Sequence, residues 1–235
     1  ERGARRRVVF LGDSLTFGWG VEKDDLFETL LEASLDAEIL NFGHGNTNTD
    51  QQVALFRDEG LALAPDAVVL FVFINDAEPT PRRSRWAFLG HSRMATFVWS
   101  RIKTVRSRLV PELGFEDYYR GLYEEGQPGW EQMKRALAEL AELCRAHGIA
   151  LRAVLLPELH DPAREPFAAQ HAKIAAELAR HRVPVLDLAP LFRDVEEPVK
   201  LWVALDDAHP NARAHRRIAE LVRPFLAVPE VEGAR

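Results

Sequence analysis

Cysteine is nearly absent from this sequence, whose 235 residues include one, Cys144. A single cysteine excludes an intrachain disulfide and any metal site built on several cysteines. The chain also lacks an apolar run that approaches the roughly 18 residues of a membrane-spanning helix, and it shows no signal peptide. Because it opens with Glu1 rather than Met, the removal of an upstream targeting or anchoring segment is compatible with it, and the compartment stays open.

An excess of positive charge is missing as well, since the net charge is −6 and the pI is near 5.8. This balance gives no general reason to expect nucleic-acid binding. Hydrophobic residues make up 47% of the chain, which is enough for a sizeable core, and the length suits one domain over residues 1–235. Internal repeats and low-complexity tracts are absent from the sequence.

Short apolar runs rich in β-branched residues predict buried parallel strands, and helical patterns lie between most of them. The runs occupy residues 6–12, 37–43, 67–74, 149–157 and 183–190. The clearest helical patterns cover residues 130–148 and 211–226. This alternation predicts an α/β fold with three α/β/α layers, a flavodoxin-like doubly wound sheet of about five parallel strands. In such a sheet the ligand site lies beyond the carboxyl ends of the strands.

Chemically active side chains gather where the predicted strands end. Gly12-Asp13-Ser14 follows the first strand, residues 41–46 the second and Asn75-Asp76 the third, while Asp206 and His209 precede the last helix. A serine needs a base to become nucleophilic, an imidazole needs a carboxylate to fix its tautomer, and an oxyanion needs preset donors. Spacing alone leaves a second interpretation open, in which Ser14 caps a helix and His209 caps the last one. The GKS/T phosphate loop and the GxGxxG dinucleotide pattern are both absent from the first loop.

Four blocks in this order resemble those of the SGNH, or GDSL, hydrolase family. They read GDSLTFGWGV, NFGHGNTNTDQQ, FINDA and DDAHPNARAHRRIAE. The resemblance implies that Ser14 is the nucleophile and that its own N–H is an oxyanion donor. It likewise implies that Asn75 is the oxyanion asparagine and that Asp206 and His209 are the family's Asp-x-x-His pair. Asp207 is a rival carboxylate, but the Asp-x-x-His register favours Asp206.

One position departs from the family pattern. Asn46 stands where the family usually has its oxyanion glycine, while Gly43 and Gly45 lie nearby. Asn46 still carries a backbone N–H, and asparagine tolerates positive φ better than most residues. Either Asn46 or, after a local shift, Gly45 would therefore supply the third donor.

The resemblance implies a serine hydrolase that cleaves carboxylic esters through an acyl-Ser14 intermediate, an esterase or lipase whose substrates extend to acetylated carbohydrates. His209 would remove the Ser14 hydroxyl proton and Asp206 would orient the imidazole, so neither a metal nor an organic cofactor is needed. Two alternatives stay open. One is acyl transfer to a sugar hydroxyl with the same triad, and the other is a binding module that keeps the fold without catalysis.

Further residues on the loops at the predicted active edge are candidates for contact with a small-molecule, carbohydrate or lipid ester. They are Asp13, His44, Gly45 and His160.

Residues 79–129 form a long insertion between the third strand and the long helix. Between Pro79 and Pro111 it has no acidic residue and eight basic ones, Arg82, Arg83, Arg85, Arg93, Arg101, Lys103, Arg106 and Arg108. Helical spacing of its apolar residues predicts a helix that packs on the domain and leaves its charges in water. The alternatives are a lid over the acyl pocket, a surface for anionic lipid, or a clamp for an anionic substrate. No nucleic-acid motif accompanies the charges, so nucleic acid is not an expected partner, and the oligomeric state stays open.

Overall fold

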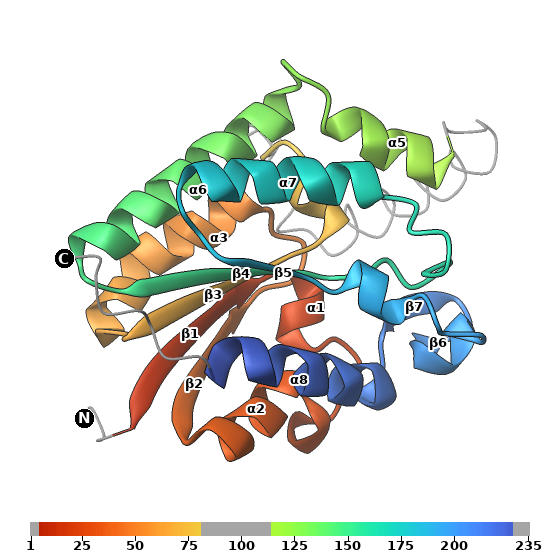
Figure 1. Cartoon of the computed structure of the whole chain (residues 1–235), viewed down its shortest axis with the longest axis horizontal. Helices are drawn as coiled ribbons and strands as arrows, with labels where there is room; N and C mark the ends of the chain where they lie inside the picture. The colour runs from red at the N-terminus through yellow and green to blue at the C-terminus, as the bar shows by residue number, and fades with distance from the viewer. Residues whose placement is uncertain (1–4, 81–113, 228–235) are drawn as a thin grey trace, which may run out of the picture.

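Five parallel strands form the central sheet of the protein in a computed structural model, which describes residues 5–80 and 114–227 (Figure 1). They are β1 (Arg6–Gly12), β2 (Ala37–Gly43), β3 (Ala67–Val72), β4 (Ala150–Leu155) and β5 (Val185–Asp187). Their spatial order is β2-β1-β3-β4-β5, and every neighbouring pair is parallel. The predicted doubly wound sheet is therefore confirmed, with each strand inside or at the bounds of its predicted run.

Helices cover both faces of the sheet and make the predicted three layers (Figure 1). Helices α3, α6 and α7 lie over one face, while α2 and α8 lie over the other. The bounds are α1 (Ser14–Phe17), α2 (Phe27–Leu35), α3 (Thr49–Leu55), α5 (Phe115–Leu122), α6 (Pro128–Ala146), α7 (Ala168–Arg180) and α8 (Ala212–Ala227). Among residues 5–80 and 114–227, none of the helices combines the length and apolar character that crossing a membrane requires.

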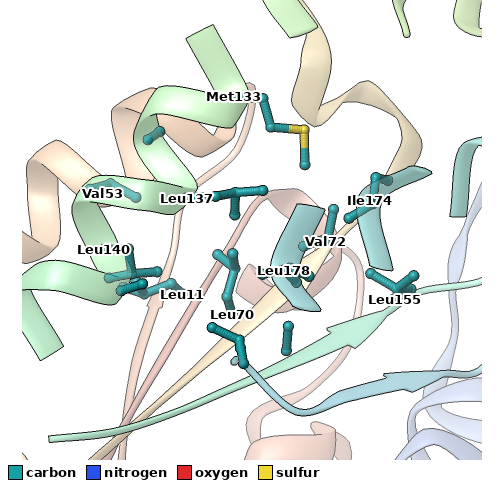
Figure 2. Packing of buried hydrophobic residues seen from close by; sticks show 14 of the residues in the cluster. Leu11, Val53, Leu70, Val72, Met133, Leu137, Leu140, Leu155, Ile174 and Leu178 are labelled. Atoms are coloured by element: carbon teal, nitrogen blue, oxygen red, sulfur yellow. The ribbon is translucent and has the colours of Figure 1, made fainter. Parts of the chain in front are cut away.

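The core consists of two apolar layers, one on each side of the sheet. Because side chains alternate along a strand, Val9 and Leu11 of β1 face one layer while Val8 and Phe10 face the other. Figure 2 shows the first layer, in which residues of α3, α6 and α7 meet residues of β1, β3 and β4. Strands buried on both faces explain why the sequence runs are continuously apolar rather than alternating.

A small hairpin outside the main sheet was not among the predicted elements. It consists of β6 (Trp202–Ala204) and β7 (Asp207–Pro210), which pair antiparallel around a turn at Leu205 and Asp206. The hairpin directly precedes α8 and carries His209. Each strand is short, and short runs of this kind have little periodicity for a sequence pattern to reveal.

The described part of the predicted insertion, residues 79–129, includes α5 and the first two residues of α6. Residues 81–113, which hold all eight basic residues named above, lie outside the described residues. The packing helix, the lid and the anionic-ligand surface therefore stay predictions.

His215 of α8 is a buried histidine that joins α8 to α2. Its Nδ1 accepts a hydrogen bond of 3.1 Å from the Phe27 backbone N–H, and its ring stacks on the Phe27 ring with centroids 5.2 Å apart. Burial lowers the pKa of His215 from 6.5 to about 4. The imidazole is therefore neutral in the folded protein under conditions where the unfolded chain would bind a proton.

This difference makes the stability of the protein pH-dependent. As the pH falls from about 6.5 to about 4, the unfolded chain gains a proton at His215 that the folded protein does not, so the contribution of His215 to the free energy of unfolding decreases, while Glu28, whose pKa burial raises to about 7, contributes in the opposite direction. The pKa shift corresponds to a loss of about 3 kcal/mol. In His215→Gln, whose amide oxygen can still accept from Phe27, this contribution is absent, so its free energy of unfolding in urea should rise relative to that of wild type as the pH falls through this range. Parallel wild-type and variant curves would contradict the assignment.

Candidate active site

The first strand delivers Ser14 to the carboxyl edge of the sheet through a tight turn. The N-cap of α1 is Asp13, whose Oδ1 accepts a 2.9 Å hydrogen bond from the Leu15 N–H. Ser14 is thus the first residue of α1 rather than its cap, and its side chain is half-buried. Because Asp13 supplies the cap, the Ser14 hydroxyl remains available for a different partner.

That partner is His209, which is 195 residues away in the sequence. Ser14 Oγ lies 2.9 Å from His209 Nε2. The imidazole comes from β7 and reaches the N-terminus of α1, as the position of the hairpin beside α1 allows. The alternative, in which both residues cap helices, is not favoured by the geometry. Asn211 Oδ1, not His209, accepts hydrogen bonds from the backbone N–H groups of Arg213 and Ala214 at the start of α8.

The carboxylate that contacts the imidazole is Asp207, and this corrects the prediction of Asp206. Asp207 Oδ1 lies 2.5 Å from His209 Nδ1 and also accepts the His209 backbone N–H at 3.1 Å. Asp207 and His209 are two apart in β7, so their side chains point to the same side of the strand. Asp206 lies in the preceding turn and is exposed, and within the described residues it makes no hydrogen bond with His209 or Ser14. The aspartate that contacts the imidazole in this structure therefore lies two residues before His209, whereas the family's register has three.

The hydrogen bonds define the tautomer of the imidazole. The bond to His209 lowers the pKa of Asp207, so its carboxylate is ionised and can only accept. Nδ1 of His209 therefore carries the proton that it shares with Asp207, and Nε2 presents its lone pair to the Ser14 hydroxyl. This is the arrangement that a general base for Ser14 requires.

Asn75 lies at the end of β3, where the sequence predicted an oxyanion donor. It belongs to a short 3-10 segment, Ile74–Ala77, and its Nδ2 donates a 3.0 Å hydrogen bond to Asp13 Oδ2. An amide nitrogen has two N–H groups, so the bond to Asp13 leaves a second one for a ligand. The Ser14 N–H makes no hydrogen bond to another described residue, as expected at the first position of a helix. These two donors are the predicted ones.

A pair of buried carboxyl groups lies behind these donors. Asp13 is 1% exposed and Asp76 is 1% exposed, and Asp76 accepts hydrogen bonds from the Gln52 side chain and the Phe73 N–H at 2.8 and 2.9 Å. Burial raises the pKa of Asp13, and burial together with the charge of Asp13 raises the pKa of Asp76 still further. Asp13 therefore contacts the site through its hydrogen bond with Asn75. Its side chain is buried, and its contact with substrate stays a prediction.

Asn46 adopts a left-handed backbone conformation. Its φ is 60°, and the residue is exposed in the loop after β2. Gly45 does not have a positive φ, and a Cβ built on it would meet nothing within 4 Å. In the described part of the chain, the Asn46 N–H has no hydrogen-bond partner. The left-handed backbone is the conformation that asparagine tolerates, while its role as the third donor stays a prediction.

Asn41, near the end of β2, connects this strand to the segment that carries Ser14. Its side-chain nitrogen donates to the Thr16 carbonyl at 2.8 Å and to the Glu28 carboxyl, while its oxygen accepts from the Gly43 N–H at 2.7 Å. Burial raises the pKa of Glu28 to about 7. At Gly43 a Cβ would lie 2.3 Å from the Phe17 nitrogen, so only glycine allows β2 to approach α1 this closely. Sequence reasoning singled out neither Glu28 nor this use of Asn41.

The two histidines predicted as substrate contacts lie on loops, as expected, and have partners of their own. His44 Nδ1 lies 3.1 Å from the Gly45 carbonyl, and its backbone N–H donates to the Gly12 carbonyl. His160 contacts the buried Glu158 carboxylate and packs edge-on against the Trp202 ring. Neither has a hydrogen bond to Ser14 or His209, and their contact with substrate stays a prediction.

Metal binding was not predicted for this site. Among residues 5–80 and 114–227, no group of three or more His, Cys, Asp or Glu side chains is arranged to hold a metal ion.

Solved structures with similar folds include several lipolytic proteins. An alpha/beta hydrolase enzyme from the metagenome of Lake Arreo, Spain, superimposes with a TM-score of 0.60 at 17% identity, over 97% of this chain and 99% of that one. A member of the lipolytic protein G-D-S-L family from Veillonella parvula gives 0.57 at 15% identity, over 95% and 100%. The lipase/acylhydrolase from Enterococcus faecalis gives 0.56 at 17% identity, over 94% and 95%. These likenesses show the shared fold.

A comparison with curated proteins finds no significant match. The family comparison does find one, and it covers most of the chain. Residues 10–217 match the GDSL-like Lipase/Acylhydrolase family, a range that contains Ser14, Asn75, Asp207 and His209. The chain therefore belongs to the GDSL-like lipase/acylhydrolase family, and this membership indicates an ester-hydrolysing enzyme.

Proposed function

We propose that the protein is a serine hydrolase that cleaves carboxylic esters through an acyl-Ser14 intermediate. The observation that carries the proposal is the chain of hydrogen bonds from Ser14 Oγ to His209 Nε2, at 2.9 Å, and from His209 Nδ1 to Asp207, at 2.5 Å. A serine hydroxyl is a weak nucleophile until a neighbouring base takes its proton, and this chain provides the base in the right tautomer.

The first half of the reaction forms the acyl-enzyme. Ser14 Oγ attacks the ester carbonyl carbon while its proton passes to His209 Nε2, and the carbonyl oxygen becomes an oxyanion. Asp207 faces the positive imidazolium that results, and its negative charge stabilises it. The tetrahedral intermediate collapses when His209 returns the proton to the alcohol oxygen, which leaves as the alcohol. Ser14 then carries the acyl group as an ester.

The second half releases the acid. A water molecule attacks the acyl carbon, His209 takes one of its protons, and the proton then returns to Ser14 Oγ as the carboxylic acid departs. In both halves the Ser14 N–H and the second Asn75 N–H would donate to the oxyanion, with the Asn46 N–H as the third donor. Acyl transfer would differ only in the acceptor, because a sugar hydroxyl would attack the acyl carbon in place of water.

Covalent labelling tests the proposal directly. A fluorophosphonate phosphorus is attacked by an activated serine oxygen with loss of fluoride, so the wild-type protein should gain one adduct. Peptide mapping should place that adduct on Ser14, and labelled protein should lose its activity toward short p-nitrophenyl esters. A folded wild-type protein that gains no adduct, or gains it at another residue, would refute the proposal and favour the non-catalytic binding module.

A further inference from the structure

The Asp207 carboxylate has a third donor besides the two of His209. Its Oδ1 receives both the His209 side chain and the His209 backbone N–H, while its Oδ2 accepts a 3.2 Å hydrogen bond from Trp19 Nε1. Trp19 belongs to the loop after α1, 188 residues before Asp207. The two oxygens therefore have separate partners: Oδ1 contacts the imidazole of His209, and Oδ2 accepts from the indole of Trp19.

The hydrogen bond from Trp19 matters because the Asp207 side chain is partly exposed to solvent. Its side chain is 32% exposed, and it belongs to a short hairpin rather than to the main sheet. With Oδ1 alone engaged, the carboxylate could turn about its terminal torsion, which is broad for an aspartate, and water could compete for it. The Trp19 bond fixes the plane of the carboxylate while Oδ1 stays on His209.

The backbone conformation and packing on both sides of Trp19 restrict the position of its side chain. Gly18 and Gly20 have φ values of 81° and 78°, which residues with a Cβ rarely adopt. The N–H groups of Gly18 and Trp19 both donate to the Ser14 carbonyl at 3.1 Å. On the other side, a Cβ at Gly20 would lie 2.5 Å from Val203 of β6, so this loop packs directly on the hairpin that carries Asp207.

Burial does not account for the position of Trp19. The residue is 55% exposed, and its ring lies 6.4 Å from the His209 ring at an interplanar angle of 49°. Trp19 thus belongs to the exposed large hydrophobic residues, and what distinguishes it is the hydrogen bond from its indole N–H to Asp207 and the position of its ring beside that of His209.

We infer that Trp19 is a positioning residue of the active site, which orients Asp207 through its indole N–H and thereby supports a triad with a two-residue Asp-x-His spacing. This inference rests on the proposed function, since the orientation matters only if His209 acts as the base. Trp19 acts through Asp207 and takes no proton itself, because an indole N–H only donates.

A double-mutant cycle tests this role. Trp19→Phe keeps an aromatic ring and removes the N–H, and we expect it to lower kcat about tenfold while KM changes less than threefold. A tenfold change corresponds to roughly 1.4 kcal/mol, which is close to the lower end of what a hydrogen bond to a charged group contributes. In the Asp207→Asn background the same substitution should cost less than twofold. A substitution that only disturbed the fold would lower kcat equally in both backgrounds.

The cycle separates this inference from the proposed function. If the wild-type protein hydrolyses no ester, or if Ser14→Ala is as active as wild type, the proposed function fails. If wild type is active and Ser14→Ala is not, the inference is overturned by a Trp19→Phe variant with wild-type kcat. It is equally overturned by a loss of the same size in the presence and absence of the Asp207 carboxylate. Melting temperatures measured in parallel confirm that each variant is folded.

Discussion

Ser14→Ala is expected to lower kcat for short p-nitrophenyl esters by roughly 10⁶-fold, the scale seen when a triad serine is removed. The change deletes the oxygen that lies 2.9 Å from His209 Nε2, so no acyl-enzyme can form. KM should change little, because the hydroxyl of an uncharged serine contributes little to binding the ester before attack.

The stability of this variant serves as its control. Asp13 caps α1 and Ser14 only begins it, so the alanine should leave the thermal unfolding midpoint nearly unchanged. Steady-state hydrolysis and thermal unfolding on the same preparation make the comparison. More than a few per cent of wild-type kcat in a folded Ser14→Ala protein would rule out Ser14 as the nucleophile.

Asp207→Asn is expected to lower kcat on the order of 10³- to 10⁴-fold, as removal of the triad carboxylate does elsewhere. An asparagine amide facing His209 Nδ1 can donate, which favours the tautomer with the proton on Nε2. That tautomer cannot accept the Ser14 proton. The substitution also removes the negative charge that faces the imidazolium.

Asp206→Asn is the matched control, because the same chemical change is made one residue earlier in the chain. Asp206 is exposed in the turn of the hairpin, so its variant should retain kcat within about twofold. Kinetics of the two variants under identical conditions decide which aspartate serves the imidazole. A severe loss in Asp206→Asn with little effect in Asp207→Asn would restore the family's three-residue spacing and contradict the geometry described above.

The apolar runs and their order along the chain were sufficient to predict the sheet. The central strand β3 is buried and apolar along its whole length because helices cover both of its faces, and runs of this kind stand out in a sequence. The convergence of Ser14 and Asn75 could be predicted for a related reason, whereas His209 lies in a hairpin outside the main sheet. Residues that follow parallel strands meet at one edge of the sheet, whatever their separation in the chain.

The choice between Asp206 and Asp207 depended on the tertiary structure. The two residues are chemically identical neighbours, and which of them faces His209 depends on where the hairpin turn ends and β7 begins. A shift of one residue in a strand turns every side chain to the other side, so a small change in the turn exchanges their roles. The sequence register favoured Asp206, and the alternation along β7 places Asp207 on the imidazole.

The sequence alone thus determined the order of the strands along the chain and singled out Ser14 and His209 as candidate site residues, because buried runs, strand ends and short motifs are local features. The tertiary structure decided which carboxylate contacts the imidazole, that Asp13 caps α1 and accepts a hydrogen bond from Asn75, and that Trp19 reaches Asp207 across 188 residues. These contacts join segments that are distant in the chain. Their geometry depends on turns and side-chain directions that no local pattern encodes.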